Sequence, residues 1–384
     1  MQDYTKDRKT DTNAVTIRHW MPIWVKNAVE NRPYLKALAK KLKKDLVHGT
    51  GTYRSICISS IVKRPLVPCL VVGSGPSLDD YLPYVKDFPG VVIAGATNAR
   101  TLAASGRIPD FICCLDSNKD TWAGMEAKGF DWGDAMLITH PSCDPTILKN
   151  WKGQLRMFRP MQMGYDFFDN VYPQMYDFIE FGLVNAGCTV NTELELATLL
   201  GCAPVIITGV DLGFVDGRAR CAQFKYVEGR WERQPDPPLQ TKSAMRRSRA
   251  GCLTTEEMAV YKQNFFLLAR TEATTVYSCS RGIIRPEEVS GFIAPNEVNK
   301  ALEMHKLELS DPKEIEAKYD KVLEEFGVKI SEEENGIVRV ARIDEKKEPV
   351  PEKPLEKKAM VFQKMAGIEG IKVVEKNLDK NQKE

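Results

Sequence analysis

The sequence lacks the features that mark membrane, secreted and nucleic-acid-binding proteins. No apolar run approaches the roughly 20 residues that a membrane helix needs. The first residues, MQDYTKDRKTDTN, are charged where a signal peptide has an apolar core. The formal net charge is only +2, whereas a domain that binds nucleic acid is usually basic. We therefore expect a cytoplasmic protein that neither spans a membrane nor binds nucleic acid.

The cysteines also lack the spacing of a disulfide framework or a zinc site. The chain has ten cysteines, but several lie within apolar runs, such as Cys69 in PCLVVG and the adjacent Cys113 and Cys114 in FICCLD. Cysteine in such a run behaves as a small hydrophobic residue, and no CxxC pair is present. The sequence predicts reduced thiols, and it leaves open whether any metal is bound.

Short apolar runs alternate with helical stretches between about residues 67 and 280. Seven runs are typical of strands: PCLVVG, GVVIAGA, PDFICCLD, DAMLITH, QLRMFRP, APVIITGVDLG and TTVYSCS. Three stretches between them are typical of helices: ARTLAASG, TVNTELELATLLG and TTEEMAVYKQNFFLLARTEA. Continuous apolar strands that alternate with helices indicate a parallel sheet covered on both faces. The predicted fold class is therefore α/β, with a Rossmann-like, doubly wound, mostly parallel sheet.

The segments on either side predict helical N- and C-terminal extensions and a tail. From Trp20 to Leu46 apolar residues recur at helical spacing, and Pro33 is expected to divide this segment into two helices. Four parts are predicted: a helical extension (1–64), a nucleotide-binding catalytic domain (65–297), a helical extension (298–342) and a charged, proline-containing, disordered tail (343–384). The tail is a candidate tether for a partner.

A glycine-rich turn, VVGSGPSLDD, follows the first predicted strand. It is neither a GxGxxG fingerprint nor a GxxxxGK[ST] phosphate loop. Gly73 and Gly75 permit a left-handed backbone and close approach of a ligand. Pro76 and Ser77 suit a helix start, where N–H groups attract phosphate. The turn of Gly73, Ser74, Gly75, Pro76 and Ser77 is either a phosphate cradle or an ordinary strand-to-helix turn.

Polar residues also follow other predicted strands, at the edge where parallel α/β sheets bind ligands. Thr97 and Asn98 could hold ribose or base, or could cap the next helix. Asp116 and Asp211 could contact substrate or a metal ion, or could cap loops. His140 could act as a base or hydrogen-bond donor, or could be an ordinary turn residue. Topology alone brings these five residues to one edge of the sheet.

Four stretches, taken in order, resemble one family: LVVGSGPSLDD, TNARTLAASGRIPDFICCLD, NAGCTVNTELELATLLGCAPVIITGVDLGF and YKQNFFLLARTEATTVYSCSRGIIRPEEVSG. They resemble the MptE-like family, which includes archaeal 6-hydroxymethylpterin diphosphokinases and the central domain of bacterial motility-associated Maf glycosyltransferases. The resemblance spans about residues 65–295. The GxGPSL turn also resembles the nucleotide turn of bacterial sialyltransferases. Together these likenesses imply a Rossmann-like fold and a bound nucleotide.

The resemblance assigns residues to that nucleotide. It implies that residues 73–77 form the nucleotide turn and, by similarity with sialyltransferases, that Asn98 contacts the nucleotide. Gly187, Cys188 and Thr189, where a loop enters a helix, would form a second cradle. SGRIPDFICCLD and ITGVDLGFVDGR look closer to the Maf branch. Residues 278–281 (SCSR) depart from the Asn-x-Thr and paired glycines that are typical of the closing Maf stretch.

Three functions follow as hypotheses. The first is a nucleotide-dependent transferase of the Maf type that uses a nucleotide-activated sugar, with a CMP-linked sugar as one candidate donor. Asp211 and Asp116 would then orient acceptor or metal, and His140 would take the proton of the acceptor hydroxyl. The second transfers pyrophosphate from ATP to a hydroxymethyl pterin, with Mg²⁺ on the aspartates. The third is a catalytically degenerate nucleotide-binding module. The acceptor stays open between a glycan, a protein and a pterin.

Overall fold

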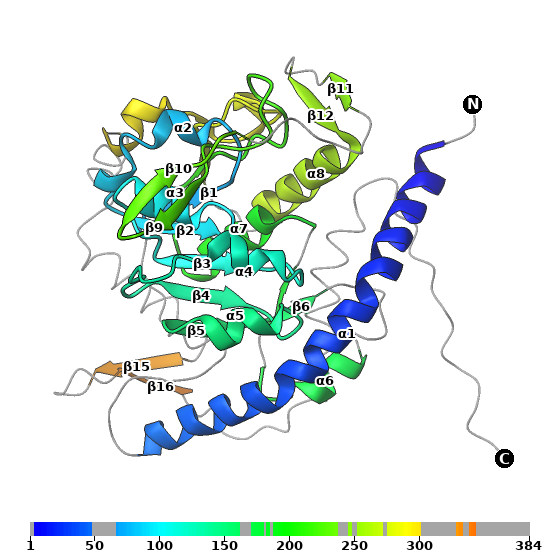
Figure 1. Cartoon of the computed structure of the whole chain (residues 1–384), viewed down its shortest axis with the longest axis vertical. Coiled ribbons are helices and arrows are strands. Elements are labelled where there is room, and N and C mark those ends of the chain that lie inside the picture. The colour runs from blue at the N-terminus through cyan, green and yellow to red at the C-terminus, as the bar shows by residue number, and fades with distance from the viewer. Residues whose placement is uncertain are drawn as a thin grey trace. The chain divides into compact units, whose positions relative to one another are not determined.

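The chain forms two compact units, residues 1–317 and 318–384. The computed structural model describes residues 4–47, 67–161, 170–179, 182–184, 187–236, 245–247, 252–271, 275–300, 328–332 and 338–342. The first unit contains the main sheet and every predicted site residue (Figure 1). The predicted tail (343–384) and the end of the predicted N-terminal extension (48–64) lie outside the described residues.

The main sheet has eight strands in the order β14-β13-β8-β1-β2-β3-β4-β5, and each neighbouring pair is parallel. The strands are β1 (Cys69–Val72), β2 (Val91–Gly95), β3 (Phe111–Cys114), β4 (Met136–Thr139), β5 (Gln154–Met157), β8 (Val205–Thr208), β13 (Val276–Ser278) and β14 (Gly291–Phe292). The seven strands predicted from apolar runs are confirmed, as is the Rossmann-like α/β fold class. Only β14, two residues long, was not predicted.

The strand order reverses between β1 and β8. Strands β1 to β5 extend from this point in one direction, and β8, β13 and β14 extend in the other. In open α/β sheets the ligand crevice lies outside the carboxyl ends of the strands at such a reversal. Residues 73–77 leave the end of β1, and residues 209–211 leave the end of β8. The predicted nucleotide turn therefore lies where the topology predicts a ligand.

Two layers of helices cover the sheet. Alternate residues of β1 point to opposite faces, as expected of a strand. Cys69 and Val71 pack in a core with α7 (Thr189–Leu199) and α8 (Glu256–Thr271). Leu70 and Val72 pack in the core of α2 (Leu78–Tyr81) and α3 (Ala99–Ala104). The face that carries α3 continues beneath α5 (Pro145–Asn150), so the domain is doubly wound as predicted.

The N-terminal helix, α1 (Tyr4–Val47), is continuous through Pro22 and Pro33, so the predicted division at Pro33 is wrong. Asn27 and Asn31 each donate two hydrogen bonds of 2.9–3.3 Å to backbone carbonyls of residues 117 and 141–143. Figure 1 shows α1 beside α6 (Tyr172–Met175), and Leu35, beyond Pro33, is fully buried. Tertiary contacts on both sides of Pro33 thus outweigh the backbone hydrogen bond that proline removes.

The second unit contains an antiparallel pair, β15 (Val328–Glu332) and β16 (Val338–Arg342). This pair corrects the end of the helical extension predicted for residues 298–342. The sequence GVKISEEENGIVRV holds alternating apolar residues on either side of an Asn-Gly dipeptide, which is a strong hairpin signal. Residues 301–327, where that prediction placed its helices, lie outside the described residues.

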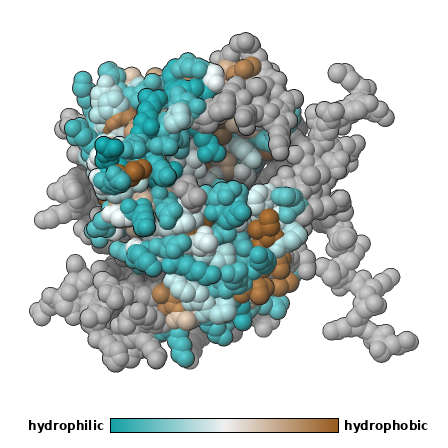
Figure 2. Space-filling model, in the orientation of Figure 1, coloured by the Kyte–Doolittle hydropathy of each residue, from teal (hydrophilic) through white to brown (hydrophobic). Residues whose placement is uncertain are grey.

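Smaller elements surround the main sheet of the first unit. β6 (Arg159–Met161) pairs with β7 (Gly182–Val184), β9 (Phe224–Val227) with β10 (Arg230–Arg233), and β11 (Met245–Arg247) with β12 (Leu253–Thr255). A further short helix, α4 (Asp120–Met125), follows β3. The described surface in Figure 2 is mostly hydrophilic. Within the described ranges, no helix combines the length and the apolar character that crossing a membrane requires.

Candidate functional site

Asp211 holds the glycine-rich turn from inside the protein. Its carboxylate accepts hydrogen bonds from Ser77 N (2.9 Å), Ser77 Oγ (2.5 Å) and Arg281 N (3.2 Å). Asp211 is 1% exposed and Ser77 is fully buried. Burial raises the pKa of Asp211, and these hydrogen bonds oppose the rise. Asp211 therefore anchors the turn, and Ser77 directs its hydroxyl to Asp211 instead of capping α2 or facing a ligand.

Gly73 and Gly75 are required because two strand ends pack closely here. A Cβ on Gly73 would lie 2.3 Å from Gly209 O, and a Cβ on Gly75 would lie 2.3 Å from Asp211 Oδ2. Neither glycine uses the left-handed backbone that glycine permits, since neither has a positive φ. The space that glycine leaves is filled by the residues that follow β8. The close approach made here is between parts of the protein.

The N–H groups of the turn are mostly used within the protein. Gly73, Gly75 and Ser77 each donate to residues 208–211 over 2.7–2.9 Å. The N–H of Ser74 makes no hydrogen bond to another described residue, and Ser74 itself is half-buried. The turn is therefore preformed by hydrogen bonds within the protein. It does not present a complete ring of free amides to an anion, but the Ser74 N–H could still donate to one.

Asn98 ties the end of β2 to this turn. Its Nδ2 donates to Val72 O (2.7 Å) and Gly73 O (2.9 Å), and the residue is fully buried. It stands at the N-cap position of α3 but makes no capping hydrogen bond, and its Oδ1 has no hydrogen-bond partner in the described structure. The adjacent Thr97 is half-buried. Asn98 thus shapes the turn, with one acceptor oxygen left over.

The second predicted cradle lies at the start of α7. Gly187 has φ +88°, and a Cβ there would lie 2.8 Å from Cε1 of Tyr261 on α8, so both conformation and packing require glycine. Cys188 is the N-cap residue and makes no side-chain capping hydrogen bond. Sulfur is a weak acceptor, and burial raises the pKa of this thiol to about 11. An 11-residue helix therefore begins at Thr189 without an oxygen cap, which favours an anion there.

Asp116 is exposed in the loop after β3. Desolvation raises its pKa, and the positive charge of Arg220 opposes the rise. The charge of Asp116 also helps to raise the pKa of Tyr261, after burial, Cys188 and Glu257. Asp116 thus interacts electrostatically with Arg220 and with Tyr261 on α8. Among the predicted acids, Asp116 is the accessible one.

His140 is buried and has both ring nitrogens in hydrogen bonds. Its Nε2 lies 2.7 Å from Leu115 O, and its Nδ1 accepts from Ser142 N at 3.2 Å. Burial lowers its pKa to about 4, so the ring is neutral at physiological pH, with Nε2–H donating. This geometry argues against the predicted role as base, because both nitrogens are already engaged in hydrogen bonds.

Glu193 on α7 was not among the predicted site residues. It is fully buried, and neither carboxylate oxygen has a hydrogen-bond partner among the described residues. Burial raises its pKa well above the usual range. Its Oε1 lies 3.2 Å from the position that a Cβ on Gly95, at the end of β2, would take. The sequence held the signal, since buried Leu196 and Ala197 lie three and four residues away on the same helix face.

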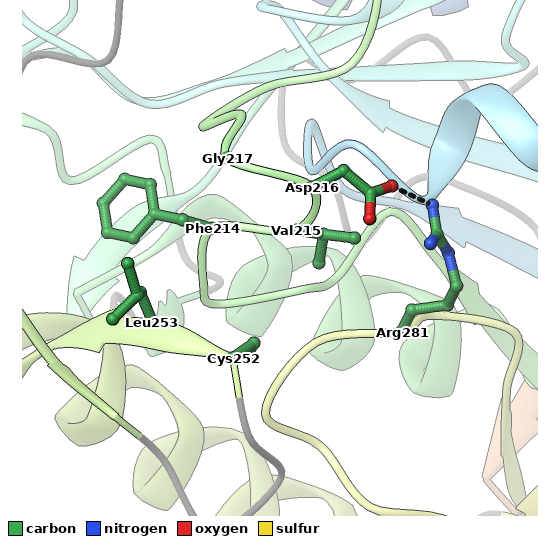
Figure 3. Close-up of a pocket in the computed structure, with 7 residues that line it drawn as sticks. All are labelled: Phe214, Val215, Asp216, Gly217, Cys252, Leu253 and Arg281. Atoms are coloured by element: carbon green, nitrogen blue, oxygen red, sulfur yellow. Dashed lines mark hydrogen bonds and ion pairs between the residues drawn. The ribbon is translucent and has the colours of Figure 1, made fainter.

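A cavity of about 420 Å³ lies on the β8–β13 side of the same edge (Figure 3). Phe214, Val215 and Leu253 form apolar parts of its wall. Arg281 enters from another loop and pairs with Asp216 across 2.9 Å. Through its backbone N–H, the same arginine also binds Asp211. The cavity includes none of the predicted catalytic or nucleotide-binding residues, but it adjoins the anchor of the turn.

The fold and the position of these residues define a doubly wound α/β domain with a candidate site at the reversal of strand order. Residues 39–217 match the family model described as 6-hydroxymethylpterin diphosphokinase MptE-like, and this match confirms the family resemblance over those residues. No curated protein matches the sequence.

Two solved structures are similar in part. One is a Maf glycosyltransferase from Magnetospirillum magneticum AMB-1, with 22% identity and a TM-score of 0.45, covering 65% of this chain and 38% of that chain. The other is the sialyltransferase CstII from Campylobacter jejuni, in complex with a substrate analogue, cytidine-5′-monophosphate. It has 14% identity and a TM-score of 0.28, covering 60% of this chain and 87% of that chain. The aligned region thus spans well under half of the Maf protein.

Proposed function

We propose that this protein is a nucleotide-dependent transferase, and specifically a Maf-like glycosyltransferase that uses a nucleotide-activated sugar. The observation that carries the proposal is the uncapped start of α7 at the carboxyl edge of the sheet, near the reversal of strand order. Residues 187–189 offer the N-terminus of an 11-residue helix, where the helix dipole favours phosphate. The turn at 73–77 would form the floor of the site.

The start of α7, the glycine-rich turn and the end of β2 would together hold the nucleotide. The phosphate would lie at the N-terminus of α7, with the Ser74 N–H as a further donor. Asn98 would contribute mainly by holding the turn in place, because both hydrogens of its Nδ2 are already donated to β1 and the turn. The half-buried Thr97 would lie beside ribose or base. A CMP-linked sugar stays one candidate donor.

Asp116 is the proposed base for glycosyl transfer. The oxygen of the acceptor hydroxyl forms a bond to the anomeric carbon, and the bond from that carbon to the phosphate oxygen breaks. The nucleotide leaves with the electron pair, and the hydroxyl proton goes to the carboxylate of Asp116. Its raised pKa makes Asp116 a stronger base than an ordinary surface aspartate. The acceptor in this proposal is a glycan or a protein.

The alternative is pyrophosphoryl transfer from ATP to a pterin, which the description of the matching family favours. That chemistry depends on Mg²⁺ to neutralise the phosphates. Asp211 fits this role poorly, because its two oxygens already accept three hydrogen bonds. Within the described ranges, no group of three or more His, Cys, Asp or Glu side chains could hold a metal ion. We therefore derive no step through Mg²⁺.

Thermal melting of the full chain with nucleotides tests the proposal. The panel is CMP, CDP, UDP, GDP and ATP, each with and without Mg²⁺. A ligand present at 100 times its dissociation constant adds about 2.7 kcal/mol of stability, which a melt detects easily. Stabilisation by CMP or by another product of sugar transfer supports the glycosyltransferase. Stabilisation by ATP only with Mg²⁺ supports the diphosphokinase, and transfer of label from ATP to pterin would establish it. No shift with any nucleotide contradicts both enzymes.

Thr189 provides a matched pair of variants for the phosphate position. Thr189→Asp places a negative charge at the first residue of α7, where it favours the helix by about 0.3–1 kcal/mol. The same charge repels a phosphate, so nucleotide affinity should fall at least about tenfold. Thr189→Asn has a similar shape without the charge and should bind more tightly than Thr189→Asp. Equal affinities of the two variants in calorimetric titrations would show that the phosphate does not lie at the N-terminus of α7.

A further inference from the structure

A short segment after β8, residues 218–222, is hydrogen-bonded to the glycine-rich turn and to the start of α2. Cys221 N donates to Ser74 O over 2.9 Å. Ala222 N donates to Asp79 Oδ1 over 2.8 Å, and Arg218 pairs with Asp79 Oδ2 over 2.5 Å. The backbone on both sides of residue 220 is therefore fixed to the turn and to the residues that follow it.

Arg220 lies in the middle of this segment and is exposed. Arg218, two residues earlier, is held in an ion pair, and Arg281 pairs with both Asp80 and Asp216. Among the described carboxylates, none lies within 4.0 Å of the Arg220 guanidinium. Of these three arginines, Arg220 is the one whose charge is not taken by a close ion pair with a described residue.

Arg220 lies beside a turn that has few free hydrogen-bond donors for an anion. The turn uses most of its own N–H groups internally, so it needs a cation to hold an anion. The backbone of Arg220 is one residue away from a direct hydrogen bond to Ser74, whose N–H is the donor that the turn retains. The charge of Arg220 also reaches Asp116, where it opposes the rise in the pKa of that carboxyl.

We propose that Arg220 is the cation that binds the phosphate of the nucleotide, in a site bounded by the turn and the start of α7. This inference rests on the proposed nucleotide-dependent function and adds a ligand-contacting residue to it. A guanidinium donates parallel hydrogen bonds to two phosphate oxygens, which suits a phosphate next to a fixed backbone. In a glycosyl transfer the same contact would stabilise the charge that develops on the departing nucleotide phosphate.

Calorimetric titration of the full chain separates this role from a structural one. The probes are CMP, CDP, UDP, GDP and ATP, together with cytidine, uridine, guanosine and adenosine. Arg220→Gln should weaken nucleotide binding about ten- to hundredfold and leave nucleoside binding unchanged. It should also reduce the dependence of nucleotide affinity on salt, since one charge contact is lost. Arg220→Lys keeps the positive charge but lacks the two parallel N–H donors of the guanidinium, so it should recover part of the affinity.

The control is Arg230→Gln, which removes an exposed arginine that pairs with Glu232 in the β9–β10 hairpin. It should bind each nucleotide as the wild type does, and thermal melts should show that both Gln variants are folded. Wild-type affinity in Arg220→Gln would overturn this inference and leave the proposed function intact. Equal loss of nucleotide and nucleoside binding would overturn it as well. If the wild type binds no nucleotide, the proposed function fails and this inference fails with it.

Discussion

Two halves of the same sheet edge use identical residue types for different purposes. In the closed half, around β1 and β8, Asp211 is buried and fully engaged with Ser77 and Arg281. In the open half, around β3 and α7, Asp116 is exposed, and the charge of Arg220 opposes the rise in its pKa. Both aspartates follow a parallel strand. The comparison shows that strand-end position brings a carboxylate to the edge, while burial and partners decide whether it supports the fold or meets a ligand.

The largest expected effect is on stability, in the closed half. Asp211→Ala leaves the N–H and hydroxyl of Ser77 buried without an acceptor, and each such group costs about 1–3 kcal/mol. We expect a loss of about 3 kcal/mol or more, which lowers the melting temperature by roughly 6–12 °C if each kcal/mol shifts it by 2–4 °C. Asp211→Asn keeps one acceptor oxygen and should fall between this variant and the wild type. A melting temperature unchanged in Asp211→Ala would remove the distinction between the two halves.

Gly75→Ala should give the next largest effect. Its Cβ would meet Asp211 Oδ2 at 2.3 Å and Gly209 O at 2.7 Å, and the second of these is backbone that cannot easily move. Overpacking of this kind costs about 1–3 kcal/mol. Stability should therefore fall together with any nucleotide affinity. Denaturant unfolding checks the first effect, and normal stability with lost affinity would show that the glycine serves a ligand directly.

Glu193→Gln should raise stability, and only at neutral or alkaline pH. Burial raises the folded-state pKa of Glu193 above the unfolded value near 4.5, so folding favours the protonated form. As pH rises above that unfolded value, the unfolded chain ionises and the wild type loses stability relative to the variant. We expect the gain to be near zero at pH 4 and about 1 kcal/mol or more at pH 8. Melting temperatures of both proteins across this range provide the test, and a pH-independent difference would contradict it.

Asp116→Asn should have the smallest effect on stability, within about 0.5 kcal/mol, as for most surface substitutions. Its effect on binding has a diagnostic sign. If Asp116 faces a phosphate held without metal, removing its charge should raise nucleotide affinity. If Asp116 holds Mg²⁺, the affinity for ATP measured with Mg²⁺ should fall instead. A stability loss as large as that of Asp211→Ala would show that Asp116 is another anchor.

The sequence predicted the sheet well because its strands are apolar, short and bounded by turn residues. All seven predicted strands lie in the observed order of a doubly wound fold. The contacts of individual side chains could not be predicted in the same way. The hydrogen bond of His140 to Leu115 O joins residues that are 25 positions apart and that local pattern cannot pair. The contact between Ser77 and Asp211 spans 134 positions of sequence and is equally invisible to periodicity. Arg220 stands in a segment without a motif, so only its position over the turn identifies it.

The long N-terminal helix has a consequence for how the chain is made. The amides of Asn27 and Asn31 bind carbonyls that lie 90 to 115 residues later in the sequence. A ribosome adds about 5–20 residues per second, so these partners emerge roughly 5–20 s after the helix does. During that interval the face of α1 that carries Ala28 and Leu35 has no partner to cover it. This helix is thus synthesised well before the residues that secure it, and the growing chain must keep its face from other proteins until they emerge.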